Sequence, residues 1–117
     1  MSIPDELSLL SLFECEPKLL DNNAPYFYNE ATYEFNNYSN EMFVVSICPS
    51  YSDIKIQVYS SDNNELLTSL NFKNVYGIEI LSDKREDSKI MIKTEGGSIR
   101  ISIKPRFKVF LDLANYP

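Results

Sequence analysis

The chain of 117 residues contains no histidine, no tryptophan and only three glycines. Without histidine, the usual general base is missing, and so are the Ser–His and Cys–His pairs of nucleophilic catalysis. Gly77, Gly96 and Gly97 cannot form a loop that cradles phosphate. No D-x-D pair or EF-hand loop occurs either. We therefore expect no catalytic residues, no metal site and no cofactor.

Cysteine is scarce as well, with Cys15 and Cys48 alone. Two cysteines are too few for a disulfide scaffold, and no CxxC or histidine completes a zinc site. We expect both to be reduced, and a single disulfide is the alternative in an exported protein. Asp5 and Glu6 stand where a signal peptide would carry basic residues. No apolar run approaches the roughly 18–20 residues that span a bilayer, so the sequence predicts a cytoplasmic protein.

Basic residues are few in the first part of the chain. Residues 1–72 hold eleven acidic side chains against Lys18 and Lys55, a net charge of −9. Residues 73–117 hold nine basic side chains against six acidic ones, a net charge of +3, which gives −6 for the whole chain. This balance disfavours nucleic acids and anionic membranes as partners. It favours a basic partner, because complementary potentials steer association.

The N-terminal segment predicts one short helix over about residues 4–14. Ser2 can cap it, and Pro4 suits its first turn. Leu9, Leu12 and Phe13 fall on one face at helical spacing. Pro17 should end the helix.

The period then changes to the alternation typical of strands, over a β-rich body of about residues 26–113. We expect Gly77 to mark a bulge or a tight bend, and Pro105 to place the start of the last strand at an edge or bulge. Residues 82–88 should form a charged hairpin loop. The fold class is mainly β (α+β), with one domain over residues 1–117. Its antiparallel sheet is curled into a sandwich or half-barrel, and the helix covers one end. The expected strands are residues 31–36, 42–48, 54–59, 66–72, 75–81, 90–93, 99–103 and 107–113.

Residues 24–41 (APYFYNEATYEFNNYSNE) combine six aromatic residues and three glutamates with no basic residue. Aromatic residues in a small β domain are usually core, and carboxylates are usually solvated surface. Tyrosine is nevertheless favoured at interfaces, because it buries a large area and keeps a polar tip. If Tyr33 and Phe35 face the core, Glu34 points outward. The expected partner-binding residues are Tyr28, Glu30, Glu34, Tyr38 and Glu41, with Asp53 and Asp62 further out.

A small acidic chain with an N-terminal helix, a β-rich body and no active-site residues resembles the bacterial immunity proteins of contact-dependent inhibition and other polymorphic toxin systems. The segment 70–81 (LNFKNVYGIEIL) and the strands that follow to Asp112 look most like such proteins. The resemblance implies a non-enzymatic inhibitor in a tight 1:1 complex with a cognate toxin, often a basic nuclease. The acidic, tyrosine-bearing surface would then cover the positive cleft of that toxin.

Two other classes remain open. A small acidic secretion chaperone or adaptor would show a two-fold interface and more helix. A carbohydrate-binding domain, or an enzyme that uses carboxylates, would show a deep pocket with converging acids of perturbed pKa.

Overall fold

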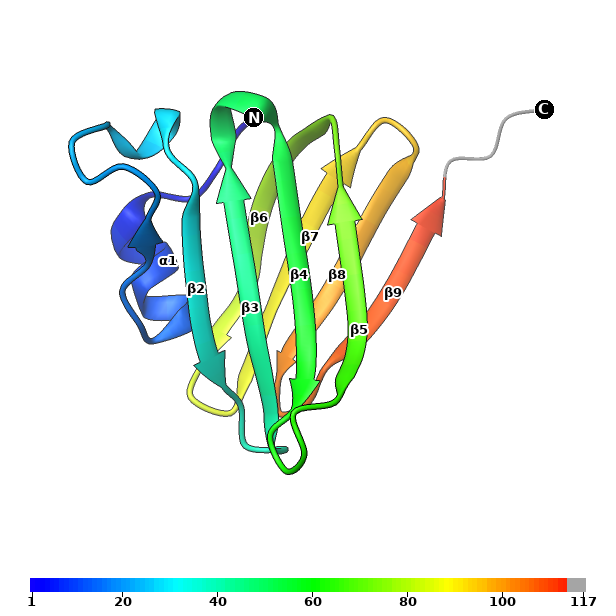
Figure 1. Ribbon diagram of the computed structural model, residues 1–117. Helices are drawn as coiled ribbons and strands as arrows, with labels where there is room; N and C mark the ends of the chain where they lie inside the picture. The colour runs from blue at the N-terminus through cyan, green and yellow to red at the C-terminus, as the bar shows by residue number, and fades with distance from the viewer. Residues whose placement is uncertain (114–117) are drawn as a thin grey trace.

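The computed structural model describes residues 1–113, which form two antiparallel sheets packed face to face (Figure 1). Strand order follows chain order within each sheet, so neighbouring strands are joined directly. The predicted mainly β fold is confirmed as a sandwich, with one helix. The first sheet contains β1 (Lys18–Leu19), β2 (Ala31–Asn36), β3 (Glu41–Cys48), β4 (Asp53–Ser60) and β5 (Leu66–Phe72). The second contains β6 (Val75–Lys84), β7 (Asp87–Thr94), β8 (Gly97–Lys104) and β9 (Lys108–Leu113).

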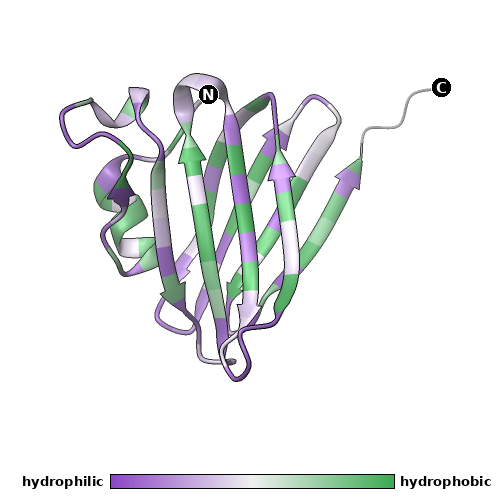
Figure 2. Cartoon of the chain, in the orientation of Figure 1, coloured by the Kyte–Doolittle hydropathy of each residue, from purple (hydrophilic) through white to green (hydrophobic). Residues whose placement is uncertain are grey.

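The core lies between the two sheets and consists mainly of β-branched and aromatic side chains. Hydrophobic and hydrophilic residues alternate along the strands, as Figure 2 shows. In the first sheet, the row Ala31–Ile47–Ile54 faces inward and is buried. Ile92 and Ile99, at paired positions of β7 and β8, are buried in the same core. One face of each sheet is thus buried in the core, and the other faces the solvent.

Helix α1 (Glu6–Phe13) is shorter than predicted. Asp5, rather than Ser2, is its N-cap, and the Asp5 carboxylate accepts a 2.7 Å hydrogen bond from the Ser8 N–H. The helix ends at Glu14, which has a left-handed backbone conformation, and not at Pro17. Leu9, Leu12 and Phe13 are buried as predicted.

Ser2 belongs to the second sheet instead. Its N–H donates to the Tyr76 carbonyl (2.8 Å), and its carbonyl accepts from the Ile78 N–H (2.9 Å). A side chain on Gly77 would approach the Ser2 carbonyl oxygen to 3.0 Å, which explains why glycine stands there. The predicted bulge at Gly77 is confirmed by a register shift between Val75 and Gly77.

Helix α1 lies at one edge of the sandwich, beside β2 and β6 (Figure 1). The Phe13 ring packs 4.6 Å from that of Tyr33, centroid to centroid, and the Ser11 hydroxyl donates to Asp83 at 2.7 Å. The Lys104 ammonium group lies 2.7 Å from the Glu14 carboxylate. The helix is therefore attached to both sheets.

One local prediction needs correction, and three short elements were missed. The charged loop at residues 82–88 is much shorter, because β6 continues to Lys84 and β7 starts at Asp87. Strand β1 and the 3-10 helices η1 (Tyr26–Tyr28) and η2 (Pro49–Tyr51) were not predicted. The placement of the last strand at an edge is confirmed for β9.

Cys15 and Cys48 are free thiols. Within residues 1–113, no helix is long and apolar enough to cross a membrane.

Candidate functional site

The predicted partner-binding residues fall into two groups at opposite ends of the first sheet. Tyr28, Glu30 and Asp53 lie at the end where β2 and β4 start and β3 finishes. Tyr38, Glu41 and Asp62 lie at the other end, in or beside the β2–β3 and β4–β5 connections, and Glu34 lies on the outward face between the groups. The structure thus separates residues that the sequence suggested as one surface.

The first group borders a hollow of about 550 Å³ on the outward face. Glu30, Cys48 and Asp53 meet there across three neighbouring strands. Tyr28, 71% exposed, and the exposed Tyr51 stand beside them on η1 and η2. The hollow therefore combines carboxylates and two accessible aromatic rings with the side chains of Lys55 and Lys73, which also line it.

The thiol of Cys48 in this hollow is poorly suited to nucleophilic attack. Burial raises the pKa of Cys48, and the negative charges of Glu30 and Asp53 raise it further. A raised thiol pKa keeps the thiolate population low.

The outward face between the two ends is polar in the middle and uncovered by any other element within residues 1–113 (Figure 1). Thr32 and Ser46 join their hydroxyls at 3.1 Å, and Lys55 follows in the same row of the sheet. Glu34 is exposed beside Val44 on the next row, as predicted from strand alternation.

At the opposite end, Glu41 has an internal role. Its carboxylate accepts hydrogen bonds from the Asn37 side chain and the Phe107 N–H, both at 2.8 Å. It thereby connects the two sheets. Tyr38 is 62% exposed, and its ring lies 5.8 Å from the Lys104 ammonium group. Asp62 is exposed in the turn after β4. Of this group, Tyr38 and Asp62 remain available to a partner.

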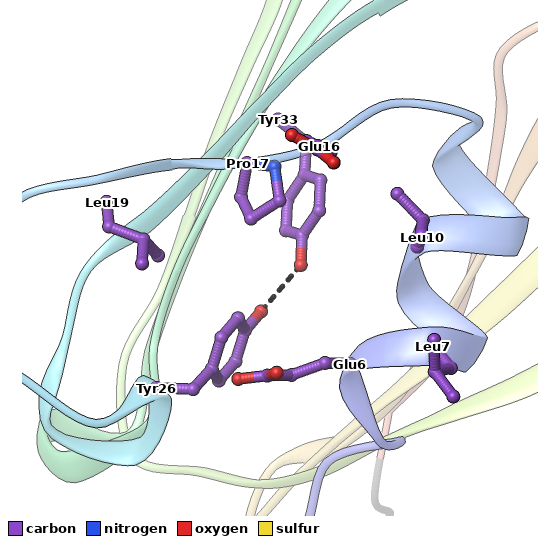
Figure 3. A pocket seen from close by; sticks show the side chains of 8 residues that line it. All are labelled: Glu6, Leu7, Leu10, Glu16, Pro17, Leu19, Tyr26 and Tyr33. Atoms are coloured by element: carbon purple, nitrogen blue, oxygen red, sulfur yellow. Dashed lines mark hydrogen bonds between the residues drawn. The ribbon is translucent and has the colours of Figure 1, made fainter. Parts of the chain in front are cut away.

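A second hollow, of about 350 Å³, lies between α1 and the chain around β1 (Figure 3). The hydroxyls of Tyr26 and Tyr33 form a 2.8 Å hydrogen bond inside it. Burial raises the pKa of Tyr26 far above its ordinary value, and the contact with Tyr33 and the charge of Glu6 add to the rise. Both phenols are therefore neutral at physiological pH. The hollow is lined by Glu6, Leu7, Leu10, Glu16, Pro17, Leu19, Tyr26 and Tyr33.

Sequence reasoning missed this second hollow, although α1 carried a signal for it. Leu7 and Leu10 lie on the side of the helix away from Leu9 and Leu12, and both are exposed. A helix that is apolar on two sides has more apolar surface than one core requires.

Within residues 1–113, no three side chains of Cys, Asp or Glu come close enough to hold a metal ion together.

No protein-family model and no curated protein matches the chain. A solved structure does match: the contact-dependent growth inhibition toxin–immunity protein complex from Klebsiella pneumoniae 342. The similarity has a TM-score of 0.74 at 19% sequence identity, and it covers 97% of this chain and 96% of the matched chain. The resemblance to toxin–immunity systems expected from the sequence is thus confirmed at the level of the fold.

Proposed function

We propose that this protein is an immunity protein that binds and neutralises a toxin protein through the acidic outward face of its first sheet. The observation that carries the proposal is the fold, shared over nearly its whole length with a chain of a toxin–immunity protein complex. The contact surface is centred on Tyr28, Glu30, Glu34 and Asp53, with Tyr38 and Asp62 at its far end.

The distribution of charge supports this surface. Residues 1–72, with a net charge of −9, form α1 and the whole first sheet, while the second sheet belongs to the part with a net charge of +3. The division seen along the sequence is therefore a division between two layers of the molecule. An acidic layer attracts a basic partner and orients it before contact.

The inhibitor role fits this chain better than the toxin role. The sequence has no histidine, and the Cys48 thiol has a raised pKa. Exposed tyrosines are instead typical of interfaces, where aromatic rings supply buried area, and the carboxylates beside them complement a basic partner. We propose a 1:1 complex with a basic nuclease, whose cleft for nucleic acid is positive, and we place the inhibitor in the cytoplasm, where such a toxin acts.

Co-purification with the product of the neighbouring upstream gene tests the proposal. We expect a 1:1 complex whose affinity falls as the salt concentration rises, because salt screens the acidic face. Glu30→Lys and Glu34→Lys should weaken it by tenfold or more, as expected for about 1.4 kcal/mol or more of lost attraction.

Glu86→Lys is the matched control, since Glu86 is an exposed carboxylate in the second sheet's β6–β7 turn. It changes the net charge equally and should leave the affinity within about twofold. A stable homodimer with no affinity for a basic neighbour would contradict the proposal and favour the chaperone or adaptor class.

A further inference from the structure

The hollow beside α1 combines apolar walls with two carboxylates. Leu7 and Leu10 line it from the helix, and Leu19 lines it from β1. Figure 3 shows the Glu6 carboxylate reaching toward Tyr26, and Glu16 lines the same hollow. Apolar side chains and carboxylates thus line one cavity of about 350 Å³.

The two carboxylates have no partners of their own. Within residues 1–113, neither Glu6 nor Glu16 forms an ion pair or a side-chain hydrogen bond. The Tyr26 and Tyr33 hydroxyls share one hydrogen bond, which leaves one O–H group free to donate and oxygen lone pairs free to accept. The cavity therefore presents acceptors and negative charge, and it lacks a cation.

From this arrangement we infer that the hollow receives a lysine or arginine side chain of the partner. The aliphatic stem lies against the leucines, and the charged head is attracted by Glu6 and Glu16, which Figure 3 draws at opposite ends of the hollow. Long basic side chains bury their stems and keep their heads at polar groups in this way. An acidic side chain would be repelled, and a purely apolar one would cover two carboxylates without compensating them.

The position of the hollow also suits this role. It shares Leu19 with a shallower hollow over β1, which in turn shares Leu20 and Glu30 with the hollow around Asp53. Neighbouring hollows that share wall residues thus lead from α1 past β1 to the outward face, and Lys18 also lines the middle one. A partner seated on that face lies next to the α1 hollow. The inference rests on the proposed function for the source of the side chain.

The first test uses the isolated protein and two defined probes, n-butylammonium and n-butylguanidinium, which reproduce the ends of lysine and arginine. In methyl NMR titrations, both should shift Leu7, Leu10 and Leu19 saturably at millimolar concentrations, whereas the neutral isostere n-butanol should not. The double variant Glu6→Gln/Glu16→Gln should weaken the apparent affinity at least about tenfold. Glu79→Gln/Glu86→Gln, which changes the net charge equally on the second sheet, should leave it unchanged.

Several outcomes would overturn the inference. They are the absence of saturable shifts up to about 100 mM probe, shifts spread evenly over all acidic residues, or full binding by Glu6→Gln/Glu16→Gln. A second measurement uses the complex with the upstream gene product. If Glu6→Gln/Glu16→Gln binds the partner as tightly as the unaltered chain, the role of the hollow is contradicted and the proposed function is not. Failure of the unaltered chain to form any complex counts against the proposed function, and the NMR result stands apart from it.

Discussion

At the scale of single residues, Lys104 is a charge held inside the fold. Its side chain is 6% exposed, and its ammonium group pairs with Glu14, which is 59% exposed. Glu14→Gln should lower the free energy of unfolding by about 2 kcal/mol, because it leaves the ammonium group without its counter-charge. The loss is below the 3–5 kcal/mol of a fully buried pair because water reaches Glu14.

Urea denaturation at neutral pH measures this loss. Glu16→Gln is the matched control, since Glu16 lies two positions away and has no ion pair within residues 1–113. It should change the free energy by less than about 0.5 kcal/mol. Equal effects of the two substitutions would show that the Lys104 pair contributes nothing specific.

Asp5 gives the stability of the protein a dependence on acid pH. Hydrogen bonding from the Ser8 N–H at the start of α1 holds the pKa of Asp5 below its ordinary value. A carboxyl group whose pKa is depressed by folding stabilises the fold above its unfolded pKa, near 4, and loses that contribution as the pH falls through its folded pKa. Asp5→Asn keeps a capping side chain and removes the charge.

The unaltered chain should therefore exceed Asp5→Asn in stability at pH 7. The difference should disappear at strongly acidic pH, where the aspartic acid is neutral. Urea midpoints measured across this range check the expectation. A difference that persists unchanged at low pH would show that charge at the cap has no part in it.

At the scale of elements, the β7–β8 hairpin depends on one glycine of a pair. Gly97 has a φ of +140°, and a side chain there would overlap the carbonyl oxygen of Asp112 on β9. A Cβ atom added at Gly96 would have open space, since Thr94 Oγ1, at 4.0 Å, is the nearest non-adjacent atom. Gly97→Ala should cost at least about 2 kcal/mol, whereas Gly96→Ala should stay within about 1 kcal/mol of the unaltered chain.

Thermal and urea denaturation of both variants provide the comparison, and the two proteins differ only in which glycine carries the extra methyl group. A similar stability of the two variants would mean that β9 can move away from the hairpin freely. Selective loss in Gly97→Ala would show that β9 is firmly seated on β8.

The elements also show where sequence reasoning succeeds and where it fails. Strands β2 and β4 are predicted by alternation, and β3 by a nearly continuous apolar run, because both patterns are local to the strand's own residues. Strand β1 has two residues, too few for any alternation. The choice of Asp5 over Ser2 as helix cap depends on the pairing of Ser2 with Gly77, which is remote in the sequence.

The residues of the candidate site also differ in whether a local sequence pattern could predict them. Exposure of Glu34 followed from the alternation of β2, and the prediction was correct. The internal role of Glu41 could not be predicted, because its carboxylate binds the Phe107 N–H, 66 positions along the chain. The α1 hollow likewise requires Glu6, Glu16 and Tyr26 to meet in space. Local patterns determine which way a side chain points, and only the assembled sandwich determines what it meets.

At the scale of the whole molecule, the two layers of unlike charge should be separable by kinetics. The triple variant Glu30→Gln/Glu34→Gln/Asp53→Asn removes three charges from the first sheet, taking the net charge from −6 to −3. Glu79→Gln/Glu86→Gln/Asp112→Asn makes the same change on the second sheet. If the acidic face steers the partner, the first variant should associate about tenfold more slowly at low salt, and the second within about twofold of the unaltered chain.

Stopped-flow association with the upstream gene product, at low salt and at about 150 mM salt, measures both rates. The difference between the variants should shrink as salt rises, because the screening length falls to about 8 Å at physiological ionic strength. Equal slowing of both variants would assign the steering to net charge and would leave the first sheet without a special role. Slowing confined to the first variant would instead assign it to the acidic layer, because the two proteins carry the same total charge and differ only in the sheet that lost it.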